Sequence, residues 1–189
     1  FVHSPFAERN GDAVLDRNGN CLFMQAVLRV EGEDTRFLLT GDITYEELSR
    51  VVNITRKHKN NNRLAWDIYK IPHHCSYKSL AEEKGKDKTK PTPEIEWLLD
   101  QGADRSVMVS TSDPIPSKST DQPPHVEAYR TYEGAANKLD ADLIVTMENP
   151  STKAPARTII EIGGNKAKLR KSAVTAAVAV TSTQSPRVG

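Results

Sequence analysis

Short runs of β-branched and aromatic residues alternate along this chain with segments whose apolar residues recur at helical spacing, and this alternation restricts the fold more than any other feature. Strands are predicted at residues 26–30, 37–40, 65–71, 106–110, 143–146 and 158–162. Helices are predicted from Thr44 onward, at 94–101 and at 126–138, with a helical turn at 79–83. Strands alternating with helices predict an α/β chain.

The segments between these elements have loop and turn composition. The first two strands are predicted to pair as a hairpin through a polar turn at 32–34. Charged and proline-containing stretches at 84–93 and 113–124 predict long surface loops, and a Gly-Gly-Asn turn occupies 163–165.

The domain is predicted to span residues 1–169. From residue 170 to 189, Ser, Thr, Ala and Val dominate without an amphipathic period, which predicts a disordered tail. The chain does not begin with Met and opens on Phe-Val-His, like the end of a strand. We therefore expect the 189 residues to be a fragment whose N-terminal half lies elsewhere.

Composition limits the classes of function. The formal net charge of +1, from 26 basic and 25 acidic residues, gives no global attraction to nucleic acid. Lysine clusters at 84–90 and 166–171 are predicted to be a solvated loop and tail. No segment approaches the roughly 18 apolar residues of a membrane span. Two cysteines, Cys21 and Cys75, make no disulfide framework and favour a reducing, cytoplasmic compartment, although a single bridge between them stays open.

Polar side chains follow the predicted strands at the positions where α/β proteins gather their sites. Asp42 comes directly after the apolar run FLLTG. A carboxylate there has two interpretations: a cap for the helix that begins near Thr44, or a rigidly held functional group.

Three histidines are further candidates. His73 and His74 follow a strand and Pro72, and they are either one buried and one surface histidine or a metal-binding pair. His125 follows Pro123-Pro124 at the start of a predicted helix, where we expect an exposed ring, either incidental or functional. His58 is predicted to lie on the surface.

Several motifs follow one another along the chain: FLLTGD, a helix, DIYKIPHHCS, VMVSTS and a later proline-flanked histidine. In this combination the chain resembles the C-terminal half of the metallo-β-lactamase superfamily. The branch with LLTGD and PHHGS motifs is the most similar. It includes the hydrolase domain attached to bacterial DNA-uptake competence channels and a phosphorylcholine esterase type. LIVTMEN and ARTIIEIGGNKAKL resemble the closing strands of that branch, so the resemblance runs from about Val27 to Leu169.

The resemblance implies half of an αββα sandwich and a hydrolase with two divalent ions, zinc or alternatively manganese. Asp42 matches the carboxylate that bridges both ions, and His74 matches a ligand of the second ion. Such a pair of ions activates a shared water and clamps the oxygens of the substrate. His73 is then expected to face the substrate, and His125 to bind it or protonate its leaving group.

The chain also departs from the family pattern. Cys75 replaces the glycine of HHGS, which introduces a β-carbon into that loop. The HxHxDH motif that supplies the first metal ligands is absent from the sequence, and His3 stands only roughly where a strand would deliver the family's intermediate ligand. We therefore expect the fragment alone to bind metal poorly and to need its N-terminal half for activity.

Three functions stay open at this point. The leading one is hydrolysis of a phosphodiester, with nucleic acid as a possible substrate. The second is hydrolysis of a small ester, lactone or lactam. The third is a catalytically dead domain that serves assembly or binding, and the choice of substrate rests on family analogy.

Overall fold

The computed structural model describes residues 1–4, 9–10, 13–14, 21–164 and 166–170. Apart from Arg170, the predicted tail lies outside the described residues. The structure confirms the α/β class, because a mixed sheet alternates with helices.

A six-stranded sheet forms the centre, in the order β1-β4-β5-β6-β7-β8. Its strands are β1 (Val2–Ser4), β4 (Phe23–Val30), β5 (Glu33–Thr40), β6 (Trp66–Ile71), β7 (Gly102–Ser110) and β8 (Asp142–Val145). The β4–β5 hairpin is antiparallel, as predicted, and β1 joins its outer edge. From β5 to β8 every pairing is parallel.

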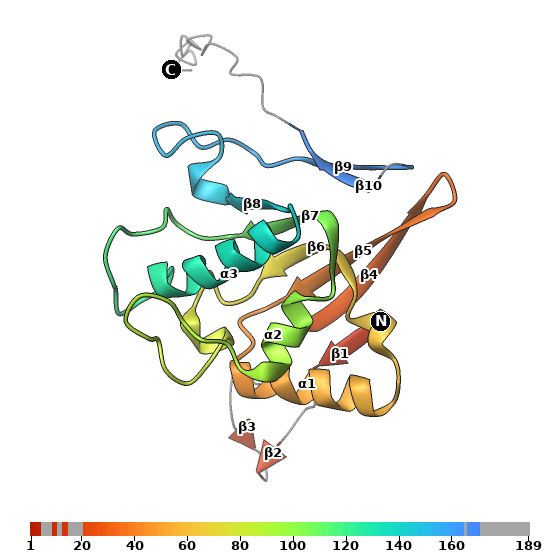
Figure 1. Cartoon of the computed structure of the whole chain (residues 1–189), viewed down its shortest axis with the longest axis horizontal. Coiled ribbons are helices and arrows are strands. Elements are labelled where there is room, and N and C mark those ends of the chain that lie inside the picture. Colours follow the sequence, from red (N-terminus) through yellow and green to blue (C-terminus); the bar gives the residue numbers. More distant parts are fainter. Residues whose placement is uncertain (5–8, 11–12, 15–20, 165, 171–189) are drawn as a thin grey trace, which may run out of the picture.

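Three helices cover one face of the sheet, and a small hairpin lies over the other face (Figure 1). The helices are α1 (Tyr45–Lys57), α2 (Pro93–Leu99) and α3 (Val126–Lys138), and the hairpin pairs β9 (Ile160–Gly163) with β10 (Lys166–Leu169). The short elements are β2 (Arg9–Asn10), β3 (Ala13–Val14) and the 3₁₀ turns η1 (Asn61–Arg63), η2 (Tyr77–Ser79) and η3 (Thr146–Glu148).

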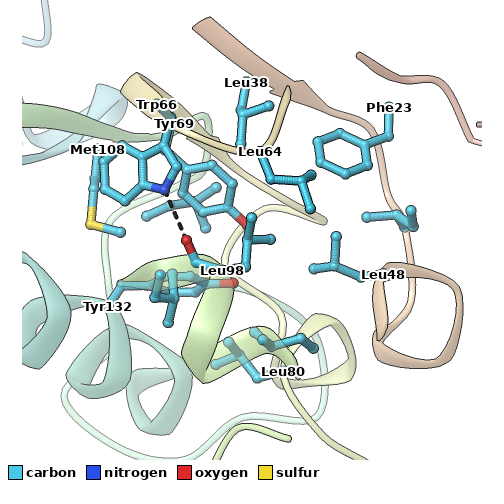
Figure 2. Close-up of a cluster of buried hydrophobic side chains, with 14 of the residues drawn as sticks. Phe23, Leu38, Leu48, Leu64, Trp66, Tyr69, Leu80, Leu98, Met108 and Tyr132 are labelled. Atoms are coloured by element: carbon cyan, nitrogen blue, oxygen red, sulfur yellow. Dashed lines mark hydrogen bonds between the residues drawn. The ribbon is translucent and has the colours of Figure 1, made fainter. Parts of the chain in front are cut away.

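The main core lies between the sheet and the helices. Alternation along β6 directs Tyr69 and Ile71 toward the helices and Ile68 toward the hairpin. Figure 2 shows the indole of Trp66 next to Tyr69 in this core, where its Nε1 donates to the Leu98 carbonyl of α2 at 3.0 Å. That hydrogen bond satisfies the one polar atom of the ring inside the core.

Helix α1 follows from its sequence spacing. Leu48, Val51, Val52 and Thr55 are buried and recur at intervals of three and four residues, so they form one face. Thr44 occupies the N-cap position, yet its side chain makes no capping hydrogen bond. The helix therefore begins where the sequence predicts, without a side-chain cap from Thr44.

Several boundaries differ from the predictions. Strand β7 begins at residue 102 rather than 106, and the helical turn predicted at 79–83 is the 3₁₀ turn η2 at 77–79. The prediction of a solvated tail at 166–171 is wrong for 166–169, which form β10. Ala167 of β10 is buried against the sheet while the neighbouring Lys168 is exposed, and one small apolar residue between lysines gives a weak strand signal.

The loop predicted at 84–93 has no regular structure before α2, but it is anchored to α3. Thr89 is fully buried, its amide donates to the Glu127 carbonyl at 3.0 Å, and the Thr131 hydroxyl donates to the Thr89 carbonyl at 2.5 Å. The loop is thus held at the start of α3, beside the edge of the sheet where the strands end.

Gly102 should be indispensable for packing at the start of β7. A β-carbon there would lie 2.5 Å from the Trp66 ring and 2.6 Å from Leu139, so Gly102→Ala must displace a buried indole. We expect a loss of about 1–3 kcal/mol in the free energy of unfolding, measured with urea. Gly163→Ala is the matched control, because nothing lies within 4 Å of its β-carbon position. Equal stability of the two variants would contradict this packing.

Candidate active site at the edge of the sheet

The polar residues singled out in the sequence converge at one edge of the sheet. Parallel strands end at the same edge, and here Ile71 of β6 is paired with Ser110 of β7, which is in turn paired with Val145 of β8. The segments that leave these strand ends therefore start side by side, and Asp42 follows the end of the adjacent β5. This edge is the candidate site.

The turn after β6 has an unusual backbone. His73, His74 and Cys75 have φ values of 48°, 52° and 65°, in the left-handed region. Such a conformation costs about 1–2 kcal/mol for each residue with a β-carbon. The turn is closed by hydrogen bonds from the Cys75 amide to the Pro72 carbonyl at 3.1 Å and from the Ser76 amide to the His73 carbonyl at 3.0 Å.

Asp42 and His74 meet at this edge. His74 Nε2 lies 3.7 Å from Asp42 Oδ1, and both side chains are partly exposed. His74 Nδ1 lies 2.7 Å from the Thr111 carbonyl. Because a carbonyl only accepts, Nδ1 donates this hydrogen bond, and Nε2 is the ring nitrogen that faces Asp42.

The alternative role of Asp42 as a helix cap is wrong. The N-cap position of α1 is Thr44, two residues later, and the first backbone bond of the helix runs from the Leu48 amide to the Thr44 carbonyl at 3.0 Å. The Asp42 carboxylate instead faces His74 at the strand edge.

His73 differs from its neighbour. Its ring is half-buried, and its Nδ1 is buried without a hydrogen-bond partner. Burial lowers the pKa of His73, and the negative charge of Asp42 offsets this only in part. Lys70 and Lys78 act in the same direction as burial, so positive charge also surrounds this ring.

Lys70 belongs to the site, although the sequence analysis did not identify it. It lies in β6 and is half-buried; burial lowers its pKa, while Asp42 raises it. A lysine within a strand whose other residues, apart from Asp67, are apolar or aromatic was the available signal. Its proximity to Asp42 depends on the β5–β6 pairing, which the sequence pattern does not specify.

Cys75 is fully buried, and burial raises the pKa of its thiol to about 12. The thiol interacts with Ser110, whose hydroxyl lies 2.8 Å from that of Ser112. Neither Cys75 nor Cys21 is in a disulfide. The thiol of Cys75 is therefore a packing group and not a nucleophile.

His125 is buried, with 1% of its surface exposed, so the expectation of an exposed ring is wrong. Its amide donates to the Cys75 carbonyl at 3.1 Å, and its Nδ1 accepts from the Tyr77 amide at 3.4 Å. The Tyr77 ring packs edge-on at 4.9 Å. Contacts with residues 75 and 77, far away in the sequence, cover this histidine.

The remaining histidines lie elsewhere. His3 Nε2 contacts the Arg63 carbonyl at 2.9 Å, and its ring stacks on Phe23. His58 is exposed, as predicted, after the end of α1. Within the described part of the chain, no group of three or more His, Cys, Asp or Glu side chains is arranged to hold a metal ion. Asp42 and His74 provide two donors of the type that zinc binds.

No protein-family model matches the chain, and no curated protein matches it. Among the described residues, no helix combines the length and apolar character needed to cross a membrane.

Cys75→Gly should be more stable than Cys75→Ala, the reverse of the usual order. Both variants lose the sulfur, but only Ala keeps a β-carbon at φ 65°. We expect Gly to exceed Ala by about 1 kcal/mol in the free energy of unfolding, measured with urea. Greater stability of the Ala variant would show that the left-handed turn is not strained at this position.

Acid should destabilise the chain in part through His125. Burial lowers its pKa, and an interaction with the Asp121 backbone only partly offsets this. The folded pKa thus lies below the unfolded value of about 6.5, so the unfolded chain takes up the proton first as the pH falls. The resulting loss of stability begins near pH 6.5 and grows down to the folded pKa.

His125→Asn removes this titration and keeps an acceptor for the Tyr77 amide. We expect its free energy of unfolding to fall less between pH 7.5 and 5.5 than that of the unmodified chain. Identical pH dependence of the two proteins would contradict the lowered pKa.

Proposed function

We propose that this chain is the C-terminal half of a metal-dependent hydrolase that cleaves phosphodiesters. The observation that carries the proposal is the arrangement of Asp42 and His74, in which the hydrogen bond of Nδ1 to the Thr111 carbonyl turns Nε2 toward the carboxylate. Metal-binding histidines commonly donate their second ring N–H to such a carbonyl. The resemblance to the metallo-β-lactamase superfamily supports the same interpretation.

The donor chemistry fits divalent ions, with zinc proposed and manganese as the alternative. Asp42 and His74 would hold them together with upstream ligands, which the proposal places in an HxHxDH motif. When bound, such ions polarise a phosphoryl oxygen and activate water. The chain's own contribution is to present a carboxylate and an oriented imidazole at the edge of the sheet.

His73 and His125 have different roles in this proposal. The neutral, half-buried ring of His73 can accept a proton or a hydrogen bond from the substrate at this edge. His125 is buried under Tyr77, so we assign it to positioning the His73–Cys75 turn rather than to contact with substrate.

The surrounding charge supports an anionic substrate. Lys70 and Lys78 act electrostatically on His73 against the larger effect of Asp42, so the site contains positive charge that a phosphodiester could use. A neutral ester or lactone has no net charge before reaction, so it gains less binding from these lysines than an anionic phosphodiester does. Nucleic acid is one phosphodiester within this proposal, and two cysteines outside any disulfide agree with a cytoplasmic location.

Substitutions in the full-length protein test the proposal, with bis(p-nitrophenyl) phosphate as substrate and zinc or manganese added. Asp42→Ala should abolish turnover and keep the fold, because the carboxylate is partly exposed and caps no helix. His74→Ala should lose one of two metal ions by elemental analysis. His73→Ala should keep both ions and lose rate, mainly in kcat.

His58→Ala is the control, because it removes an exposed histidine outside the site. Full metal content and full turnover in all three site variants would exclude this metal site. A folded, metal-free protein without activity toward any phosphodiester would instead support a catalytically dead binding domain. Reversed behaviour of the two histidine variants would exchange their roles and keep the hydrolase.

A further inference from the structure

A cavity of about 350 Å³ opens beside the candidate site. It lies between the ends of β6, β7 and β8, and its lining residues are His74, Thr111, Ser112, Asp113, Pro123, Pro124, Thr146 and Met147. His74 belongs both to the candidate site and to the cavity, because its Nε2 faces Asp42 and the residue also lines the cavity. A substrate whose phosphate lies at Asp42 can therefore extend a neighbouring group into this cavity.

The residues that line the cavity favour some classes of ligand over others. No lysine, arginine or aromatic residue other than His74 is among the described residues that line the cavity. Its one carboxylate, from Asp113, is exposed, and Thr111 and Thr146 add hydroxyl-bearing residues to the lining. Met147 is 42% exposed and, with the two prolines, adds an apolar surface.

These features exclude several classes of ligand. A carboxylate or a second phosphate would face Asp113 without a cation to balance it, which costs free energy. A quaternary ammonium group would find a negative charge but no cage of aromatic faces. A purely apolar chain would remove the Asp113 carboxylate from water without giving it a donor.

We propose that this cavity binds a neutral vicinal diol, the alcohol part of the substrate phosphodiester. An ionised carboxylate accepts from two adjacent hydroxyl groups, as the acidic residue of dinucleotide-binding folds does with a ribose. The threonine hydroxyls add donors and acceptors, and Met147 with the prolines contacts the carbon skeleton. The assignment rests on the proposed function for the position of the phosphate, but the cavity itself needs no metal to bind a diol.

A vicinal diol can belong either to a ribose ring or to a glycerol unit. The test is a titration of the ¹⁵N-labelled chain, followed by amide chemical shifts, with methyl β-D-ribofuranoside, glycerol, methyl 2-deoxy-β-D-ribofuranoside and choline as separate probes. We expect the ribofuranoside to shift the amides of residues 111–113 and 146–147 and to bind at least about fivefold more tightly than the deoxy probe. If glycerol binds as tightly as the ribofuranoside, the cavity recognises the diol alone. If glycerol binds more weakly, the cavity recognises the ribose ring.

Asp113→Asn should weaken ribofuranoside binding by at least about fivefold, because an amide offers one acceptor oxygen in place of two. Asp121→Asn is the matched control, an exposed aspartate of the same loop that does not line the cavity. Equal binding of the ribose and deoxyribose probes, preferential binding of choline, unchanged binding by Asp113→Asn, or no shift at the cavity would each overturn the proposal.

The two proposals fail separately. Loss of diol binding with intact metal binding at Asp42 and His74 would remove only the diol site. Diol binding in a protein that binds no metal and cleaves no phosphodiester would keep the cavity and remove the hydrolase.

Discussion

The parallel pairing of β5, β6, β7 and β8 is the constraint on which the candidate site depends. Four strands that run in one direction must end at one edge, and the segments that leave them must start there. The helices that connect them cover one face, and the β9–β10 hairpin contacts the other. Strands covered on both faces are mostly apolar, so polar groups concentrate beyond the strand ends.

Strand β6 contains one acidic residue, Asp67, which departs from the apolar character of strands covered on both faces. Asp67 is almost fully buried, and its carboxylate accepts from the Arg36 amide of β5 at 2.8 Å. It therefore completes the pairing between β5 and β6 where their register provides few backbone bonds. A buried carboxylate with this partner is structural, which separates it from the partly exposed Asp42 two positions beyond the end of β5.

The strained turn after β6 is stable because three different elements hold it. The His73 amide donates to the Gly41 carbonyl at 3.1 Å, the His74 ring contacts the Thr111 carbonyl, and the Cys75 carbonyl accepts from the His125 amide. These partners follow β5, follow β7 and precede α3, respectively. Consecutive left-handed residues with β-carbons persist where the surroundings hold them in this way, and such strained segments are frequent at functional sites.

Local patterns predicted the elements well, and contacts between distant segments account for what they missed. Helix α3 spans Val126–Lys138, as its spacing predicts, and Asp42, His73 and His74 do lie at strand ends. The burial of His125 depends on Tyr77, 48 residues away, and no local pattern contains that information. The first residues of β7 lack an apolar alternation, so only pairing with β6 shows them to be a strand. The metal-binding and catalytic roles stay predictions.

Residues 111–113 connect the two halves of the candidate site physically. The Thr111 carbonyl orients the His74 ring through its hydrogen bond with Nδ1, while residues 111–113 line the cavity together with His74. Ser112 is anchored through its hydroxyl to Ser110 at the end of β7, so the short segment is fixed to the sheet. A ligand that moves this segment must also move the hydrogen bond that directs His74 to Asp42. The segment 111–113 therefore contributes both to the lining of the cavity and to the hydrogen bond that turns His74 toward Asp42.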